Sequence, residues 1–309
     1  MTECECPNIY NKVDLPTEDI SKKIADVKKF ICNEFIYGGH WLSLGGSAFI
    51  LSILLMLELS IKWELILIVY LLLQIVYNYD HYRCLEEDSK SNSNRTNHLK
   101  KYQKFFPIIL VIYGSLFFGL LYTFGNTISL IFGTFLLALG FLYTIFCKKL
   151  TAKIIGFKNF YTSFSVSLLV IFVTFYSFYE LSILSLIIIL FIFIRLMVNT
   201  SFCDLKDMDV DKKQNLVTLP IYFGKQKFLT FLHILNLISF VLLLTAIVTG
   251  IAPLFSIFLL LFFPYVFYYI KKAKNTDTDL QSLSNFAVDG EFILWPILLI
   301  IGNYFTTII

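Results

Sequence analysis

The chain has 309 residues, of which 57% are hydrophobic, 17% are aromatic and only 15% are charged. A soluble domain of this size is far less apolar, so the composition indicates a protein that crosses a membrane several times. The net charge of +3 gives no reason to expect a nucleic-acid partner. The six cysteines have no repeating spacing, and we expect them to be free thiols.

Residues 1–20 are polar and predict a mobile tail, whereas residues 21–309 predict a single transmembrane domain. Between residues 21 and 37, apolar side chains recur at helical spacing among lysines, which predicts an amphipathic helix on the membrane surface. These apolar positions are Ile24, Val27, Ile31 and Phe35.

Nine apolar stretches follow, each close to the ~20 residues that a helix needs to cross the hydrocarbon core. They predict an all-α polytopic membrane protein with nine transmembrane helices around a central cavity. The stretches are 41–58, 63–80, 105–123, 126–147, 160–179, 181–203, 228–249, 252–270 and 290–308.

The basic residues predict the orientation of these helices. All of the 25 lysines and arginines except Lys62 and Arg195 lie in the N-terminal region or in the connections after the second, fourth, sixth and eighth stretches. By the positive-inside rule, the N-terminus and these connections are cytoplasmic and the C-terminus is on the opposite side of the membrane.

An acidic segment follows the second apolar stretch and reads YNYDHYRCLEEDSKSNSNR, residues 77–95. If the helix continues beyond the membrane, Asp80 and Asp88 are about two turns apart and are candidate ligands of Mg²⁺. Asn78 and Arg83 lie near the same face. The alternative is a solvated, charge-balanced helix end.

A second acidic segment, SFCDLKDMDVDKKQNLVTLPIYFGK, occupies residues 201–225 at the end of the sixth stretch. On a continuing helix, Asp204, Asp207 and Asp211 share one face, whereas Asp209 lies off it. Neighbouring carboxylates repel each other unless a cation lies between them, and hard oxygen ligands suit Mg²⁺ combined with phosphate oxygens. A solvated acidic cap is the alternative interpretation of this spacing.

The second segment resembles the second aspartate-rich motif of the UbiA superfamily of intramembrane prenyltransferases, DxxDxxxD followed by a basic residue and a TLP…G tail. The stretch 139–167 is similar to the connection between the fourth and fifth helices of that family, including Tyr143, Lys158 and Asn159. The residues that match the motif are Asp204, Asp207, Asp211, Lys212, Thr218, Leu219, Pro220 and Gly224.

The first acidic segment departs from the family pattern, which is NDxxDxxxD or NxxxDxxxD. When the last aspartate of that pattern is aligned on Asp88, Cys84 stands where the middle aspartate belongs and Asp80 where the asparagine belongs. Asp88 therefore carries over directly, Asp80 is a plausible functional replacement, and we expect a divergent branch of the family.

The resemblance implies Mg²⁺-dependent transfer of an isoprenyl chain from an isoprenyl diphosphate to a lipophilic acceptor in the membrane lipid. A quinone precursor, a glycerol lipid, a carotenoid and a tetrapyrrole all remain possible acceptors. The catalytic and metal-binding residues that it implies are Asp80, Asp88, Asp204, Asp207 and Asp211. The expected substrate-binding residues are Asn78, Arg83, Tyr143, Lys158, Arg195, Asn199 and Lys212.

Arg195 is the one strongly charged residue deep within an apolar stretch, where insertion of a charge typically costs about 2.5–3.5 kcal/mol. We expect it to face the cavity with Asn199 one turn away, the alternative being a buried structural ion pair. Two other functions compete with the enzyme: a transporter or lipid-binding protein that uses the acidic segments for cation coupling, and an inactive scaffold with the same fold.

Overall fold

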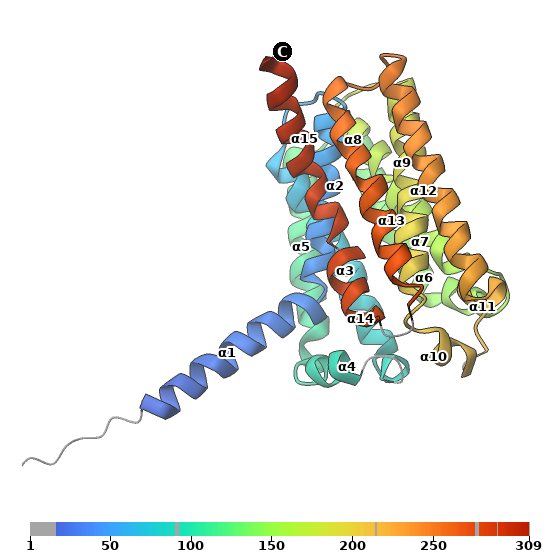
Figure 1. The fold of residues 1–309 in the computed structure, drawn as a ribbon. Coiled ribbons are helices and arrows are strands. Elements are labelled where there is room, and N and C mark those ends of the chain that lie inside the picture. The colour runs from blue at the N-terminus through green and yellow to red at the C-terminus, as the bar shows by residue number, and fades with distance from the viewer. Residues whose placement is uncertain (1–16, 90–92, 214, 276–277, 289, 309) are drawn as a thin grey trace, which may run out of the picture.

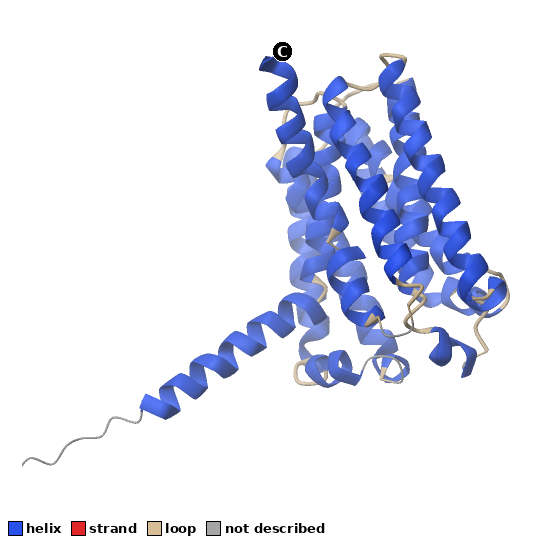
Figure 2. Cartoon of the chain, in the orientation of Figure 1, coloured by secondary structure: helices blue, strands red, loops and turns tan. Residues whose placement is uncertain are grey.

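The computed structural model describes residues 17–89, 93–213, 215–275, 278–288 and 290–308. Within these ranges the regular elements are helices and none is a strand, as Figure 2 shows, so the all-α prediction is confirmed. Most of the predicted polar tail, residues 1–16, lies outside the described residues.

Long helices form one bundle with a single helix projecting from it (Figure 1). The projecting helix is α1 (Thr17–Tyr37). The bundle consists of α2 (His40–Met56), α3 (Trp63–Asp88), α5 (Phe106–Phe124), α6 (Thr127–Ile145), α7 (Phe157–Ser167) with α8 (Leu169–Tyr176), α9 (Ile183–Cys203), α12 (Lys225–Val248), η3 (Leu254–Leu261) with α13 (Phe262–Lys272), and α15 (Glu291–Ile308).

Short elements connect these helices at the lower end of the bundle in Figure 1, which we call the motif end because both acidic segments reach it. The C-terminus lies at the opposite end. The short elements are α4 (Ser93–Leu99), η1 (Gln103–Phe105), η2 (Cys147–Ala152), α10 (Met208–Lys213), α11 (Leu219–Phe223), α14 (Leu280–Ser282) and η4 (Leu283–Val288).

Among the described residues, eight helices are long and apolar enough to cross a membrane, or nine if the bent pair of α1 and α2 counts as one span. The bend between α1 and α2 is 53°. The bend falls at Gly39, whose φ of +79° favours glycine. The Tyr77 ring is also close, because a Cβ on residue 39 would lie 3.1 Å from a ring carbon of Tyr77. The protein is thus an integral multi-pass membrane protein.

Each span packs against at least two others around the bundle. α2 contacts α3 and α15, α9 contacts α7 and α12, and α15 also contacts η3. Rings from three of these helices fill part of the interior: Phe49 lies 4.3 Å from Phe292, and Trp295 lies 5.2 Å from both Phe49 and Phe191, measured between ring centroids. The central cavity stays a prediction.

Candidate active site

The second acidic segment does not continue the helix before it. α9 ends at Cys203, residues 204–207 form a turn, and α10 begins at Met208, so the condition of a continuing helix, under which the three aspartates share one face, is not met. The turn is closed by the N–H of Asp207, which donates to the carbonyl of Asp204 at 3.3 Å. Aspartate side chains compete with the backbone for hydrogen bonds and repel each other one turn apart, which explains why the helix stops here.

Asp204 is buried, with 2% of its surface exposed, and both of its carboxylate oxygens have partners. The ammonium of Lys158 lies 3.2 Å from Oδ1, and Nδ2 of Asn159 donates to Oδ2 at 2.9 Å. Both partners come from the first turn of α7. A cation and an amide donor thus stabilise the ionised carboxylate in a place where burial alone would oppose its charge.

The first turn of α7 reaches Asp204 because the chain before it packs on the segment that follows the aspartates. The N–H of Gly156 donates to the carbonyl of Val217, and the N–H of Val217 donates to the carbonyl of Thr151, each at 3.4 Å. Gly156 has a φ of +64°, and a Cβ there would lie 2.9 Å from the Leu219 side chain. Only glycine therefore fits this close approach.

Asp207 and Asp211 are half-buried near Asp204, one helical turn apart, since the N–H of Asp211 donates to the carbonyl of Asp207 at 2.9 Å. Burial raises the pKa of the Asp207 carboxyl, and the charge of Asp204 adds to this rise. Burial likewise raises the pKa of Asp211 to about 6, again helped by Asp204. Burial is the largest cause of both shifts and the Asp204 charge adds to them, so a cation bound here would favour the ionised form of both carboxyls.

The donor set suits Mg²⁺ bound together with a phosphate better than a metal held by protein alone. Among the described residues, no three His, Cys, Asp or Glu side chains come close enough to hold a metal ion by themselves. Mg²⁺ typically takes one or two carboxylates and completes its shell with water or phosphate oxygens. Of the other polar residues of α10, Asp209 and Lys212 are exposed.

The first acidic segment has a different environment. Asp80 accepts a hydrogen bond from Thr144 Oγ1 of α6 at 2.9 Å, and the Cys84 thiol lies 3.8 Å from the same carboxylate oxygen. Arg83 is exposed. Asp88 is the last residue of α3, but its side chain is outside those that the structure describes.

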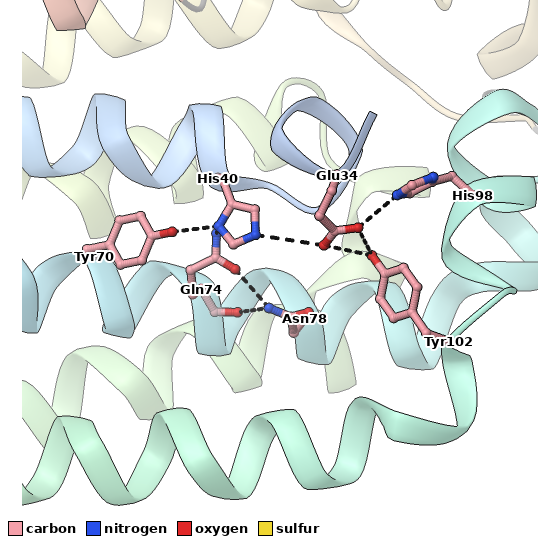
Figure 3. A network of polar contacts seen from close by, with 7 residues as sticks. All are labelled: Glu34, His40, Tyr70, Gln74, Asn78, His98 and Tyr102. Atoms are coloured by element: carbon pink, nitrogen blue, oxygen red, sulfur yellow. Dashed lines mark hydrogen bonds and ion pairs between the residues drawn. The ribbon is translucent and has the colours of Figure 1, made fainter. Parts of the chain in front are cut away.

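Asn78 is buried on α3, and its Nδ2 donates to the main-chain carbonyl of Gln74 at 2.7 Å and to the side-chain Oε1 of the same residue at 2.9 Å. Gln74 connects it to a polar network that includes Glu34, His40 and His98 (Figure 3). The sequence analysis missed this network, because no spacing rule relates a glutamate at position 34 to a histidine at 98.

Arg195 forms a buried ion pair with Glu291 of α15, to which its Nε donates at 3.1 Å and its second terminal nitrogen also donates. Its remaining nitrogen donates to Asn236 Oδ1 of α12 at 2.7 Å. Asn199 donates to the carbonyl of Val288 at 2.7 Å. Both predicted substrate-binding residues thus join α9 to neighbouring elements, and their contact with substrate stays a prediction.

Tyr143 of α6 is partly buried near the start of α7. Its ring lies 5.5 Å from that of Tyr161, measured between centroids, and Tyr161 in turn donates to the carbonyl of Leu139 at 2.8 Å. These contacts bring α6 and α7 together beside Lys158, which is one of the two residues of α7 that contact Asp204. A substrate contact of Tyr143 likewise stays a prediction.

Comparison with known proteins gives one family. The sequence profile of the UbiA prenyltransferase family matches residues 104–295. No curated protein matches the chain at a significant level.

Solved structures share the fold along most of the chain. The apo structure of a UbiA homolog from Aeropyrum pernix K1 is 12% identical, has a TM-score of 0.65, and covers 87% of this chain and 98% of its own. A UbiA homolog from Archaeoglobus fulgidus, solved with DMAPP and Mg²⁺, is 12% identical with a TM-score of 0.63 and the same coverage. A structure described as digeranylgeranylglyceryl phosphate synthase is 18% identical, has a TM-score of 0.56, and covers 88% of this chain and 98% of its own. At these identities, the likeness establishes the fold.

Proposed function

Because the chain belongs to the UbiA prenyltransferase family, we propose that it transfers an isoprenyl chain from an isoprenyl diphosphate to a lipophilic acceptor with the help of Mg²⁺. The observation that carries this proposal is the environment of Asp204. Its buried carboxylate has a lysine and an amide as partners. Two further aspartates, Asp207 and Asp211, follow it in the sequence and have raised pKa values. This arrangement provides the positive and negative groups that a metal–diphosphate complex needs.

In this proposal Asp204, Asp207 and Asp211 hold Mg²⁺ together with the diphosphate, and Asp80 and Asp88 supply carboxylates from α3. When bound, Mg²⁺ neutralises charge on the diphosphate leaving group. Two structures of the Archaeoglobus fulgidus homolog contain Mg²⁺ with DMAPP or with GPP, which supports this choice of metal and donor class.

The basic side chains of the site take the remaining phosphate charge. Lys158 is the main candidate because its ammonium is already at Asp204 while 48% of its side chain is exposed, so it can turn toward a phosphate oxygen without leaving the site. Lys212 on α10 is a second candidate. Lysine acts toward phosphate as a flexible point charge, which suits this exchange of partners.

The reaction replaces one bond at the first carbon of the isoprenyl chain. Its bond to the diphosphate oxygen breaks and the electron pair leaves with the diphosphate, which gives an allylic cation. An electron pair of the acceptor forms the new bond, and the acceptor loses a proton. A site at the end of a membrane bundle suits these steps, since the apolar interior holds the chain and keeps water from the cation.

The bundle also suggests where the isoprenyl chain lies. Phe191 precedes Asp204 on α9 by 13 residues, which corresponds to roughly 20 Å along a helix. We propose that the isoprenyl chain extends from the aspartates toward the ring cluster of Phe191, Phe292 and Trp295. We place the diphosphate on the cytoplasmic side, as the distribution of lysines and arginines predicts.

The proposal is tested with purified protein in liposomes, radiolabelled isoprenyl diphosphates of several lengths and a lipid extract as the acceptor source. We expect label to move into the lipid fraction only with Mg²⁺, and Asp207→Asn to abolish the transfer. Asp209→Asn is the matched control, because Asp209 is an exposed aspartate only two residues further along the chain. If an ion gradient drives solute uptake while no diphosphate is consumed, the transporter alternative holds. If neither occurs, the chain is an inactive scaffold.

A further inference from the structure

Glu34, near the end of α1, is the common acceptor of several side chains that are distant in sequence. Tyr102 O–H donates to Oε2 at 2.8 Å and is also 3.0 Å from Oε1. Nε2 of His98 lies 2.8 Å from Oε2, and Nε2 of His40 lies 3.7 Å from Oε1. As Figure 3 shows, these residues converge on Glu34 from the connection after α3 and from the start of α2.

From His40 the contacts continue to the helix of the first acidic segment. Nδ1 of His40 lies 3.1 Å from Nε2 of Gln74 and 2.5 Å from the Tyr70 hydroxyl. Gln74 in turn accepts both hydrogen bonds of the Asn78 amide, through its main-chain and side-chain oxygens. A continuous set of contacts therefore connects α1 to Asn78, two residues before Asp80.

The hydrogen atoms of this chain can be assigned by elimination. A main-chain carbonyl can only accept, so the Asn78 atom that contacts it must be the NH₂ nitrogen. Gln74 Oε1 then accepts as well, which leaves Gln74 Nε2 to donate to Nδ1 of His40. His40 consequently carries its proton on Nε2, the nitrogen that faces Glu34.

From Asn78 through Gln74 to His40, each donor thus points toward the Glu34 carboxylate. This direction determines which atom of the Asn78 amide is left for other partners. Both hydrogens of the Asn78 amide are used on Gln74, so its carbonyl oxygen is the polar atom that remains for other partners. An amide oxygen can ligate Mg²⁺ directly or accept a hydrogen bond from a water molecule bound to Mg²⁺.

The same carboxylate also holds α4, through His98 at the end of that helix and Tyr102 just after it. Glu34 is therefore connected to Asn78 on α3 by one route and to α4 by the other.

We propose that Glu34 is a positioning residue for the diphosphate site, which fixes the His40 tautomer and the Asn78 amide on one side and the place of α4 on the other. This inference rests on the proposed function. It also gives α1 a role in the site, since Glu34 lies near the end of this helix.

The test measures Mg²⁺-dependent binding of radiolabelled geranyl diphosphate to the full chain in liposomes. Glu34→Gln keeps the shape of the side chain but directs an NH₂ group at donors, so we expect the Kd to rise about tenfold, the effect of one lost buried hydrogen bond. Asp26→Asn is the matched control, an equal charge change at an exposed position of α1, and it should leave the Kd unchanged. Equal Kd values for the two variants would overturn the inference.

Two further variants keep the test decisive if Glu34→Gln does not fold. Tyr102→Phe removes a single donor from Glu34, and we expect a rise of about two- to threefold in Kd. Asn78→Asp adds an oxygen ligand but directs carboxylate oxygens at the acceptors of Gln74, so we expect weaker binding. Unchanged binding in the first variant, or tighter Mg²⁺-dependent binding in the second, contradicts the assigned role.

The hydrogen assignment has a readout that does not depend on activity. Nitrogen-15 NMR of the wild-type protein should show His40 protonated on Nε2, and a His40 protonated on Nδ1 alone would refute the assignment. Failure of the proposed function is distinguishable from failure of this inference. In the first case wild-type protein does not bind the diphosphate, and in the second it binds but Glu34→Gln binds equally well.

Discussion

The ammonium of Lys158 lies 3.2 Å from Oδ1 of Asp204, although 46 residues separate the two in the sequence. Asp204 is almost fully buried, whereas about half of the Lys158 side chain is exposed. The carboxylate is thus held in place while its cationic partner keeps access to a substrate. The proposed function depends on this pair, and the first prediction concerns it directly.

Replacing Lys158 by methionine removes the charge and keeps most of the apolar stem. We expect the Kd for geranyl diphosphate to rise about 10- to 100-fold, since a hydrogen bond to a charged group contributes roughly 1.5–3 kcal/mol. Lys153→Met, which changes an exposed lysine five residues earlier, is the control and should bind normally. Normal binding by both variants would remove Lys158 from the site.

Cys84→Asp restores the aspartate of the family pattern. Cys84 is buried and its thiol lies 3.8 Å from Asp80, so the new carboxylate repels its neighbour when no metal is present. We expect a lower unfolding temperature without Mg²⁺, a larger rise on adding Mg²⁺ than in wild type, and retained or increased turnover. Thermal unfolding with and without Mg²⁺ measures the first two effects, and complete loss of turnover would show that the alignment of the first motif is incorrect.

Arg195→Met leaves Glu291 as an unpaired buried carboxylate. Loss of one partner of a buried ion pair typically destabilises a protein by about 3–5 kcal/mol, whereas an apolar replacement of both partners is often nearly neutral. We therefore expect Arg195→Met to be strongly destabilised in thermal unfolding and the double variant Arg195→Met with Glu291→Leu to recover most of the loss. A double variant that is no better than the single one would mean that the ion pair does not carry the effect.

The raised pKa of Asp211 predicts how Mg²⁺ binding depends on pH. Because burial raises this pKa to about 6, the carboxyl holds a proton below pH 6 in the metal-free protein, and Mg²⁺ must displace it. The Mg²⁺ concentration for half-maximal turnover should therefore increase as the pH falls through 6, by about tenfold per unit if one proton is displaced. In Asp211→Asn this dependence should disappear, and a transition near pH 4 in wild type would contradict the assignment.

Much of the fold follows from the sequence because membrane spans have a strong signal in length and hydropathy. Each predicted stretch corresponds to a helix or a consecutive helix pair, and the helix predicted at residues 21–37 forms as α1. The sequence determines the number of spans less well. α2 has only 17 residues, which is short for a membrane span, and the chain bends between α1 and α2 at Gly39. Hydropathy does not register such a bend.

The contacts within the site could be predicted from the sequence only in part. The family pattern singled out Lys158, Asn159 and Asp204, and the structure brings these three together. The shared face of Asp204, Asp207 and Asp211 was predicted for the case of a continuing helix, and the turn at 204–207 interrupts that helix. The partner of Arg195 was not predicted, since Glu291 begins the last apolar stretch and nothing in the spacing joins residues 96 positions apart.

The most direct test of the central claim is the binding of radiolabelled geranyl diphosphate to wild type and to Asp204→Asn, each with Mg²⁺ and with a chelator. The substitution keeps the size of the side chain and removes the charge that faces Lys158. We predict saturable, Mg²⁺-dependent binding to wild type and its loss in the variant, with equal amounts of folded protein in the membrane. Binding that does not need Mg²⁺, or that survives Asp204→Asn, would contradict a metal–diphosphate site at these aspartates.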